Sequence, residues 1–494
     1  MMTAMQDANE ALITGASISM RTASIGLIVT AIAVACTASP CHAVEPRLNV
    51  LFIAVDDLRP MLGCYGDTMV QSPCIDAFAA TATRFDRAYC QFALCNPSRA
   101  SLLAGRRPET LGVFTLAKFV RDGNPDVVTL PEHFKNHGYE TRSYGKIFHV
   151  TNGNHGDDAS WSVPAWPERK RVAAKPGDPN APVDETSDHS DDDPAVIVEG
   201  PVDGLADVKV ADKAVGTLRE LRDRPFFLAV GFHKPHLPFV APKADWDRYD
   251  PAALSLPANR TLPSGAPAFA SNDAAELRRY KGIPQQGPPV TDAEARHLIH
   301  GYHACVSHVD AQVGRVLAEL DAAGLADSTV VVLWSDHGYH LGEQGTWTKR
   351  TTWEMATRVP LVIRCPNRGT TGASVASIVE LLDIYPTLVD LCGLPLPPKL
   401  EGRSLARLLD EPGRDWPHAA RSLIAKKAAD LGGAIKGRAV RTPRYRWVEW
   451  TGQPLPEAVH ELYDHDVDPA ETRNIADTPA GRAVIAELRA AHGG

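Results

Sequence analysis

The sequence predicts an α/β protein with a large mixed, mostly parallel sheet sandwiched by helices, followed by a smaller C-terminal α+β domain. Three observations predict it: apolar runs of strand length end abruptly in polar residues, helical patterns alternate with these runs, and the pattern changes after residues 395–398. The chain has 494 residues, of which 44% are hydrophobic, and this is enough to bury a large core.

Four apolar runs carry the sheet prediction: residues 48–55, 226–232, 329–334 and 360–363. Their nearly continuous apolarity indicates strands that are covered on both faces, as in a parallel sheet. The clearest helix begins at Thr291, where Glu294 completes a capping box, and runs toward Gly324. Alternating strands and helices of this kind are typical of helices packed on both faces of a sheet.

Two stretches, residues 175–200 and 251–289, are rich in Pro and polar residues and show little periodicity. We expect both to be long irregular segments, and the second to border a substrate cleft. Short runs such as residues 445–450, separated by Gly and Pro, follow residue 395. These patterns predict a large domain over residues 44–395 and a smaller one over residues 396–494.

The N-terminus predicts export. Met20 and Arg21 precede an apolar stretch that ends at Cys36, and the small residue Ala43 follows soon after. This pattern is typical of a signal peptide, residues 1–43, and it indicates a periplasmic or secreted protein without stable membrane insertion after cleavage. A membrane anchor is disfavoured because the apolar stretch is short. A lipoprotein attached at Cys36 remains an alternative.

The net charge is −9, and Lys and Arg are spread along the chain without a basic run. Nothing would offset the charge of a phosphate backbone, so we expect no nucleic-acid partner. Nine cysteines become seven once Cys36 and Cys41 leave with the signal peptide. An odd number of cysteines cannot all pair in disulfides, so at least one has another role, and Cys95 is the candidate for that role.

Cys95 opens the string Cys-Asn-Pro-Ser-Arg-Ala-Ser-Leu-Leu. Asn96 can cap a helix whose first position is Pro97, which would place Cys95 just outside the helix N-terminus. Backbone N–H groups and the helix dipole attract anions at that place. A buried structural cysteine beside an ordinary helix start is the competing interpretation.

The full string resembles the signature of type I sulfatases, which belong to the alkaline phosphatase superfamily. The resemblance implies a sulfuric ester hydrolase that removes sulfate from a sulfated saccharide. It implies that a formylglycine-generating maturation enzyme oxidises Cys95 to Cα-formylglycine. One hydroxyl of the hydrated aldehyde would attack sulfur and the other would expel sulfate, whereas a plain thiol would be trapped as a stable ester.

Two pairs of polar residues follow predicted strands and indicate a metal site. Asp56 and Asp57 follow the first strand, and Asp336 and His337 follow the run at 329–334. Sites in open α/β sheets lie beyond the carboxyl ends of strands, where such pairs can meet, and carboxylates are ligands of hard cations. Together with Cys95 they resemble the sulfatase calcium site, so we expect one Ca²⁺. His337 stands where many sulfatases have Asn, and imidazole is a softer ligand than a carboxamide oxygen.

Further residues gain roles by the same resemblance. Lys146 and His149 would flank the formylglycine as hydroxyl stabiliser and proton acceptor. His236 would protonate the leaving alcohol, and Lys349 would bind the sulfate. Arg99 would bridge the nucleophile and the sulfate, where a planar and permanently charged fork suits an oxyanion.

The motifs at residues 56–60, 95–99 and 335–343 resemble the iduronate-2-sulfatase-like branch in particular, and the resemblance runs from about residue 49 to residue 469. Arg59, in the first motif, either lines the substrate pocket or forms a structural ion pair. Two other functions compete with sulfatase activity. One is a phosphodiesterase or phosphonate monoester hydrolase of the same superfamily, and the other is a non-catalytic binder of sulfated glycans in which Cys95 stays a thiol.

Overall fold

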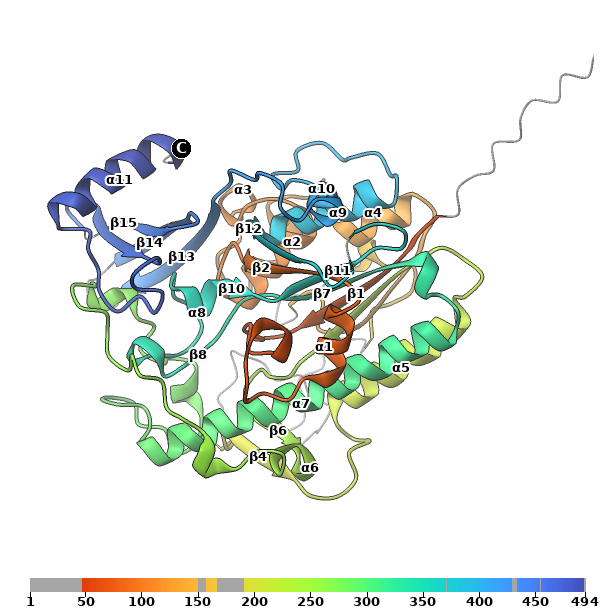
Figure 1. The fold of residues 1–494 in the computed structure, drawn as a ribbon, viewed down its shortest axis with the longest axis horizontal. Coiled ribbons are helices and arrows are strands. Elements are labelled where there is room, and N and C mark those ends of the chain that lie inside the picture. Colours follow the sequence, from red (N-terminus) through yellow and green to blue (C-terminus); the bar gives the residue numbers. More distant parts are fainter. Residues whose placement is uncertain are drawn as a thin grey trace, which may run out of the picture. The chain divides into compact units, whose positions relative to one another are not determined.

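An eight-stranded mixed sheet forms the centre of the fold (Figure 1), with strand order β10-β2-β11-β7-β1-β5-β3 and β12 beside β2. Pairs β1–β5, β1–β7, β3–β5 and β2–β12 are parallel, whereas β11 and β10 are antiparallel to their neighbours. The predicted mixed, mostly parallel sheet is confirmed. The strands are β1 (Asn49–Val55), β2 (Thr83–Tyr89), β3 (Glu140–Gly145), β5 (Phe226–Phe232), β7 (Thr329–Ser335), β10 (Arg358–Val359), β11 (Leu361–Arg364) and β12 (Ser374–Glu380).

The computed structural model describes residues 47–149, 157–166, 191–369, 371–428, 433–453 and 455–492, all within the unit Pro46–Gly494. The predicted signal peptide lies outside the described residues, as does most of the predicted loop at 175–200. The described end of that loop contains a short strand, β4 (Ala195–Val198), which pairs in parallel with β6 (Phe239–Pro242). This strand was not predicted.

Strand β1 illustrates why apolar runs form the centre of the sheet. All seven of its residues are buried, as are those of β5 and β7. Leu51 and Ile53 belong to one core cluster, whereas Val50 and Phe52 belong to a second cluster on the opposite face. Side chains alternate between the faces of a strand, and each such buried side chain contributes about 1.5–3 kcal/mol.

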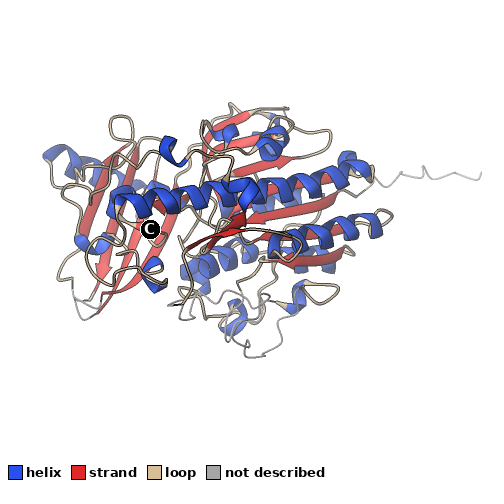
Figure 2. Cartoon of the chain, turned by 90° about the horizontal axis from the view of Figure 1, so that it is seen from below, coloured by secondary structure: helices blue, strands red, loops and turns tan. Residues whose placement is uncertain are grey.

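Helices cover both faces of the sheet (Figure 1). On one side lie α1 (Pro73–Ala79), α5 (Ala206–Glu220) and α7 (Asp292–Ala322), and on the other α2 (Cys95–Ala104), α4 (Leu130–Asn136) and α9 (Ile384–Leu391). Figure 2, seen from below, shows the long helix α7 in front of the strands. Its predicted capping box is confirmed, because Thr291 N donates to Glu294 Oε2 at 2.7 Å and Glu294 N donates to Thr291 Oγ1 at 3.3 Å.

The C-terminal part is a four-stranded antiparallel sheet with one helix, which confirms the predicted α+β character. Its elements are β13 (Ala420–Ala428), β14 (Gly433–Arg441), β15 (Tyr445–Gly452), β16 (Val459–Asp464) and α11 (Pro479–His492). One face packs on α11 through residues such as Trp447 and Ile485. The other face packs on the large part through Trp450 and Trp353. The remaining short elements are α3 (Pro108–Leu111), α6 (Lys243–Trp246), α8 (Glu354–Thr357), α10 (Ala406–Asp410), β8 (His340–Leu341) and β9 (Trp347–Thr348).

A buried ionic network joins the two sheets. Arg446, on β15, has a side chain that is only 1% exposed, and it contacts Glu354 of α8 and Glu471. Its Nε donates to Glu471 Oε1 at 2.5 Å, and its Nη1 donates to Thr352 O at 2.8 Å. Burial opposes charge on Glu354, but Arg446 and Arg441 outweigh it and hold the pKa of this carboxyl far below its usual range. The residues of this network are therefore charged, and the positive charges of the arginines offset the negative charges of the carboxylates.

Replacing Arg446 by Met should lower the free energy of unfolding by about 3–5 kcal/mol, because two buried carboxylates would lose their partner. Urea unfolding followed by fluorescence measures the change. Arg444→Met is the matched control: Arg444 pairs with Asp464 at 2.7 Å, but its side chain is 51% exposed, so the loss should be much smaller. If both variants lost the same free energy of unfolding, the buried network would contribute no more to stability than the exposed ion pair, and the prediction would be wrong.

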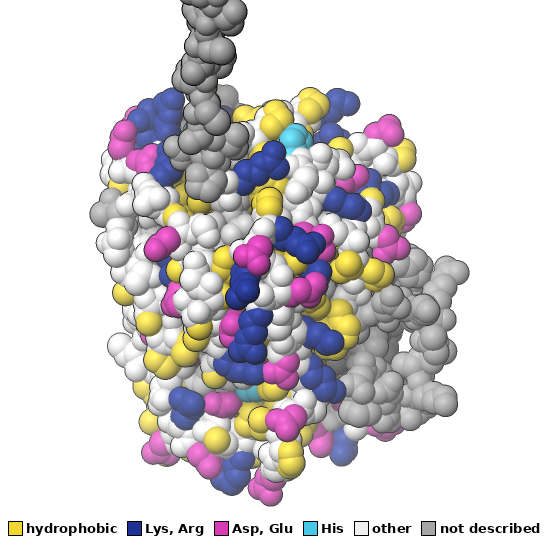
Figure 3. Space-filling view, turned by 90° about the vertical axis from the view of Figure 1, so that its right-hand side faces the viewer, with side chains coloured by type: hydrophobic (Ala, Val, Ile, Leu, Met, Phe, Trp, Pro, Cys, Tyr) yellow, Lys and Arg dark blue, Asp and Glu magenta, His cyan; other side chains and the backbone are white. Residues whose placement is uncertain are grey.

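The surface carries mixed charge. Figure 3 shows Lys and Arg side chains interspersed with Asp and Glu over the middle of one face. Ion pairs between neighbouring helices are of this kind, such as Arg219 of α5 with Glu319 of α7 at 2.6 Å. Among the described residues, no helix combines the length and the apolarity needed to span a bilayer.

Candidate active site

The carboxyl ends of four adjacent parallel strands bring the predicted site residues together. Asp56 and Asp57 follow β1, and Asp336 follows β7 one position beyond the pair Val55–Ser335. Lys146 follows β3, and the segment that contains His236 follows β5. These strands are neighbours in the sheet, so their ends meet at one edge, as the sequence pattern predicted.

Cys95 is the first residue of α2 and is fully buried. The predicted cap is wrong: Leu94, with extended backbone, precedes the helix, and Ser98 N donates to Leu94 O at 3.1 Å. The Asn96 side chain instead donates to the carbonyls of Thr115 and Lys118, at 2.8 and 2.7 Å. The helix N-terminus still lies at Cys95, but Asn96 anchors a neighbouring loop.

The seven cysteines of the described residues are all free thiols, so the odd cysteine count does not by itself single out Cys95. The groups that surround Cys95 distinguish it from the other cysteines. Cys95 Sγ lies 3.3 Å from His337 Nε2 and 3.9 Å from Asp57 Oδ1. The ammonium groups of Lys146 and Lys349 each lie 3.6 Å from the same sulfur. Two cations at this distance favour negative charge on the atom at this position.

Asp57, Cys95, Asp336 and His337 each offer one ligand atom, and these atoms lie within 4.8 Å of one another. His337 Nδ1 lies 2.9 Å from Gly338 O, which can only accept a hydrogen bond, so Nδ1 is the donor of this pair and Nε2 is the ring nitrogen that faces the cluster. Burial raises the pKa of Asp57 even though Lys349 and His236 oppose this shift. A divalent cation would offset that burial cost, so the donor set fits a metal ion.

Asp56 and Arg99 form a fixed support beside this cluster. Asp56 contacts Arg99 Nη2 at 2.8 Å and Lys146 Nζ at 2.5 Å. Burial alone would raise the pKa of Asp56, but these two cations hold it well below its usual range. Arg99 Nε also contacts Asp336 Oδ2 at 2.8 Å, so one guanidinium orients two carboxylates from different strand ends. Asp56 also belongs to a second group of ligand atoms, with Asp57, Cys95 and His236.

Lys349 and His236 also lie close to Asp57. Lys349 Nζ contacts both Asp57 oxygens, at 3.0 and 2.9 Å. His236 Nδ1 lies 2.5 Å from Leu237 O, which turns Nε2 toward Asp57 Oδ2 at 3.9 Å. The structure also buries His149, three residues after Lys146. The catalytic roles given to these side chains stay predictions.

Two residues of the site were missed by sequence reasoning. Glu276, from the irregular stretch at 251–289, contacts both Lys349 and His236. Tyr302 of α7 donates its hydroxyl to Asp57 O at 2.8 Å, where Asp57 adopts the left-handed φ of 61°. Arg59 forms an ion pair with Glu343 at 2.7 Å. This contact agrees with the structural ion pair, one of the two roles that the sequence analysis considered for Arg59.

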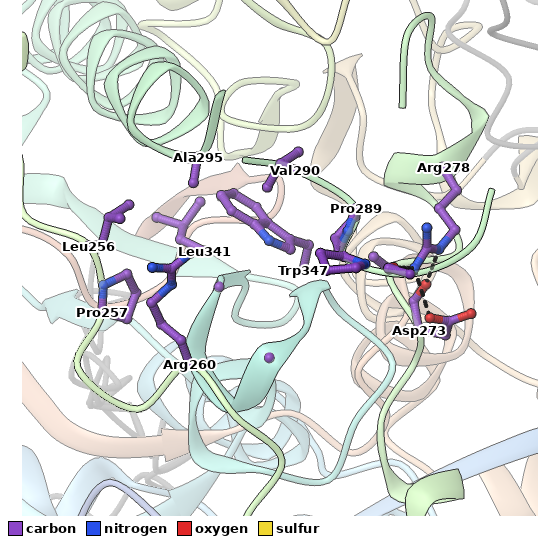
Figure 4. Close-up of a pocket in the computed structure, with 15 residues that line it drawn as sticks. Leu256, Pro257, Arg260, Asp273, Arg278, Pro289, Val290, Ala295, Leu341 and Trp347 are labelled. Atoms are coloured by element: carbon purple, nitrogen blue, oxygen red, sulfur yellow. Dashed lines mark hydrogen bonds and ion pairs between the residues drawn. The ribbon is translucent and has the colours of Figure 1, made fainter. Parts of the chain in front are cut away.

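A cavity of about 300 Å³ lies beside Trp347, two residues before Lys349 (Figure 4). Figure 4 shows the Trp347 ring facing Val290 and Ala295, with Arg260 below it. Part of its wall comes from the stretch at 251–289, and part from β8 and β9. None of the predicted site residues lines this cavity, so the expectation that the irregular stretch borders a substrate cleft stays a prediction.

The fold and the site match known proteins. The sulfatase family model matches residues 48–394, and the model of the N-sulphoglucosamine sulphohydrolase C-terminal region matches residues 342–492. Iduronate 2-sulfatase of Homo sapiens is 32% identical over 544 aligned residues, which cover 92% of this chain and 96% of that protein.

Two solved structures share the fold. One is a protein in complex with its substrate D-glucosamine-2-N,6-O-disulfate, with a TM-score of 0.70 and 24% identity over 90% of this chain and 96% of that one. The other is the phosphonate monoester hydrolase of Silicibacter pomeroyi, with a TM-score of 0.70 and 23% identity over 90% and 94% of the two chains.

Fold, site and sequence together define a hydrolase of sulfate esters. The chain belongs to the sulfatase family, and it resembles iduronate 2-sulfatase over nearly its whole length. The family and the branch indicated by the sequence motifs are confirmed.

Proposed function

We propose that this sulfatase removes sulfate from a sulfated saccharide, with Cys95, oxidised to formylglycine, as the nucleophile. The observation that carries the proposal is the position of Cys95 at the N-terminus of α2, between two ammonium groups and beside the metal-ligand cluster. The proposal of a saccharide substrate is supported by similar proteins. One is named iduronate 2-sulfatase, and another was solved in complex with D-glucosamine-2-N,6-O-disulfate, its substrate.

One divalent ion completes the site in this proposal, and we expect Ca²⁺. Asp56, Asp57, Asp336, His337 and the oxidised Cys95 side chain would hold it. When bound, the ion would stabilise negative charge on the nucleophile and the sulfate. Arg99 would keep the carboxylates of Asp56 and Asp336 in place, which adds an orienting role to the predicted contact of Arg99 with the substrate.

The remaining side chains act on charge and protons. Lys146 and Lys349, each 3.6 Å from Cys95 Sγ, would stabilise the charge that develops as the nucleophile attacks. His149 would accept the proton of the second hydroxyl. His236 directs Nε2 toward Asp57, because Nδ1 is held by Leu237 O, and would protonate the leaving sugar oxygen.

Localisation and maturation belong to the same proposal. Residues 1–43 would direct export as a signal peptide to the periplasm or the medium, with lipid attachment at Cys36 as the alternative. The chain would need a formylglycine-generating enzyme as a partner. Residues 44–395 would form the catalytic domain and residues 396–494 the C-terminal subdomain.

The function is tested by comparing kcat/KM on nitrophenyl sulfate and nitrophenyl phosphate, followed by a panel of defined sulfated saccharides. We expect sulfate to be preferred, and at least one saccharide to release inorganic sulfate. Faster turnover of a phosphonate or phosphate ester than of any sulfate ester would overturn the proposal in favour of the phosphonate hydrolases that share this fold.

His236→Ala should lose far more activity on a sulfated sugar than on nitrophenyl sulfate, because only the poor leaving group needs a general acid. General acids typically contribute about 10²- to 10⁴-fold. Lys349→Ala should slow both substrates by similar factors, since a cation that binds sulfate supports both. Equal losses of His236→Ala on the two substrates would remove the acid role from His236.

A further inference from the structure

The Glu276 carboxylate contacts both side chains that the proposed function assigns to the sulfate and the leaving group, Lys349 and His236. Its Oε1 lies 3.2 Å from Lys349 Nζ and 3.5 Å from His236 Nε2, and its side chain is only 8% exposed. Contacts of 3.2 and 3.6 Å through Lys349 Nζ place this oxygen no more than about 7 Å from Cys95 Sγ. An acidic group so close to an anion-binding site needs an explanation.

The backbone that carries Glu276 is anchored on two sides. Asn272 Nδ2 donates to Trp347 O at 2.8 Å and also contacts Lys349 O. Lys426 of β13 donates to the carbonyls of three consecutive residues, Phe269 (3.0 Å), Ala270 (2.7 Å) and Ser271 (2.8 Å). Glu276 therefore extends from a held segment, and its position does not depend on a freely moving loop.

A carboxylate at this place reduces the attraction of the pocket for anions, and the reduction grows with the charge of the anion. Sulfate esters carry one negative charge. Phosphate monoesters carry about two above pH 7, since their second ionisation has a pKa of about 6. Repulsion from Glu276 is therefore about twice as large for a phosphate monoester as for a sulfate ester at the same position.

We propose that Glu276 is a specificity-determining residue, which makes the pocket favour singly charged sulfate esters over doubly charged phosphate monoesters. The inference rests on the proposed function, because it takes Lys349 and His236 as the groups that face the transferred group and the leaving oxygen. It concerns the charge of the substrate and not the identity of the saccharide.

The test is Glu276→Gln, which removes the charge and keeps the shape. Values of kcat/KM are measured at pH 8 on nitrophenyl sulfate, nitrophenyl phosphate and nitrophenyl methylphosphonate, of which only the phosphate carries two charges. The preference for sulfate over phosphate should fall about 10- to 100-fold, as expected for one charge at roughly 7 Å and an effective dielectric constant near 20. The preference for sulfate over methylphosphonate should stay within about threefold.

Asp273→Asn is the matched control. It removes one negative charge from the same segment, but Asp273 is 82% exposed and pairs with Arg278 at 3.0 Å, as Figure 4 shows. Neither preference should change in this variant. Peptide mass spectrometry across Cys95 confirms equal formylglycine content in all proteins compared.

Equal loss on all three substrates in Glu276→Gln would overturn the inference, because it would show that Glu276 only orients Lys349 and His236. If Glu276→Gln does not fold, Glu276→Ala is compared in the same way and the same criterion applies. Failure of the wild-type protein to hydrolyse any sulfate ester would instead refute the proposed function, so the two failures are distinguishable.

Discussion

Cys95→Ala should reduce turnover of sulfate esters by about 10⁴-fold or more while the protein keeps its fold. Removal of a nucleophile typically has an effect of this size. The fold should survive because Cys95 begins α2 and packs among polar and charged groups, whereas the apolar cores consist of other residues. Steady-state rates and circular dichroism of the two proteins provide the measurement.

Cys95→Ser is the informative companion, since a serine has one hydroxyl and cannot form the hydrated aldehyde. It should form at most one covalent sulfate ester per chain, visible by mass spectrometry, without turnover. Wild-type protein made with a maturation enzyme should show formylglycine at position 95. Turnover of Cys95→Ala at the wild-type rate would contradict the assignment of Cys95 as the nucleophile. An unmodified thiol at position 95 in wild-type protein isolated from its own source would favour the alternative function, a non-catalytic glycan binder.

Asp336→Asn and Asp57→Asn should each lower the content of bound divalent metal and reduce kcat/KM by about 10³-fold, because the charge stabilisation that an ion supplies is worth several kcal/mol. Both carboxylates are fully buried within the ligand cluster, and Asp336 also anchors Arg99. Plasma emission spectrometry gives the metal content. A chelator should inactivate the wild-type protein, and Ca²⁺ should restore it.

Asp310→Asn controls for the loss of a buried carboxylate. Asp310 is also buried, but it accepts from the backbone of Cys74 and Ile75 on α1, away from the ligand cluster. Its replacement should lower stability and leave the metal content unchanged. Full metal occupancy in both cluster variants would refute the assignment of the site.

Much of this architecture was predictable because it depends on short-range patterns. Strand β1 is a continuous apolar run that ends at Asp56 and Asp57, and the place of ligands beyond the ends of parallel strands is a general property of the fold. The capping box at Thr291 is a local motif, with its two partners three residues apart. Such signals survive in the final structure because tertiary packing agrees with them.

The errors and omissions concern contacts between distant residues. Asn96 has the composition of a helix cap, but two loop carbonyls about twenty residues away compete for its side chain. Glu276 lies in a stretch without periodicity, and only the folded chain brings it to Lys349. Tyr302 reads as one more large residue on the buried face of α7, although its hydroxyl supports the backbone of Asp57. No local pattern distinguishes these residues from their neighbours.

The contact of Lys426 with three successive carbonyls has a consequence for how this enzyme can diversify. The side chain comes from β13, about 155 residues later in the chain than the segment it holds. The segment that carries Glu276 is thus held in place by the C-terminal sheet, and a substitution at β13 can move a carboxylate that contacts Lys349 and His236. Exchange of the C-terminal sheet between two relatives would exchange the anchor of that carboxylate with it.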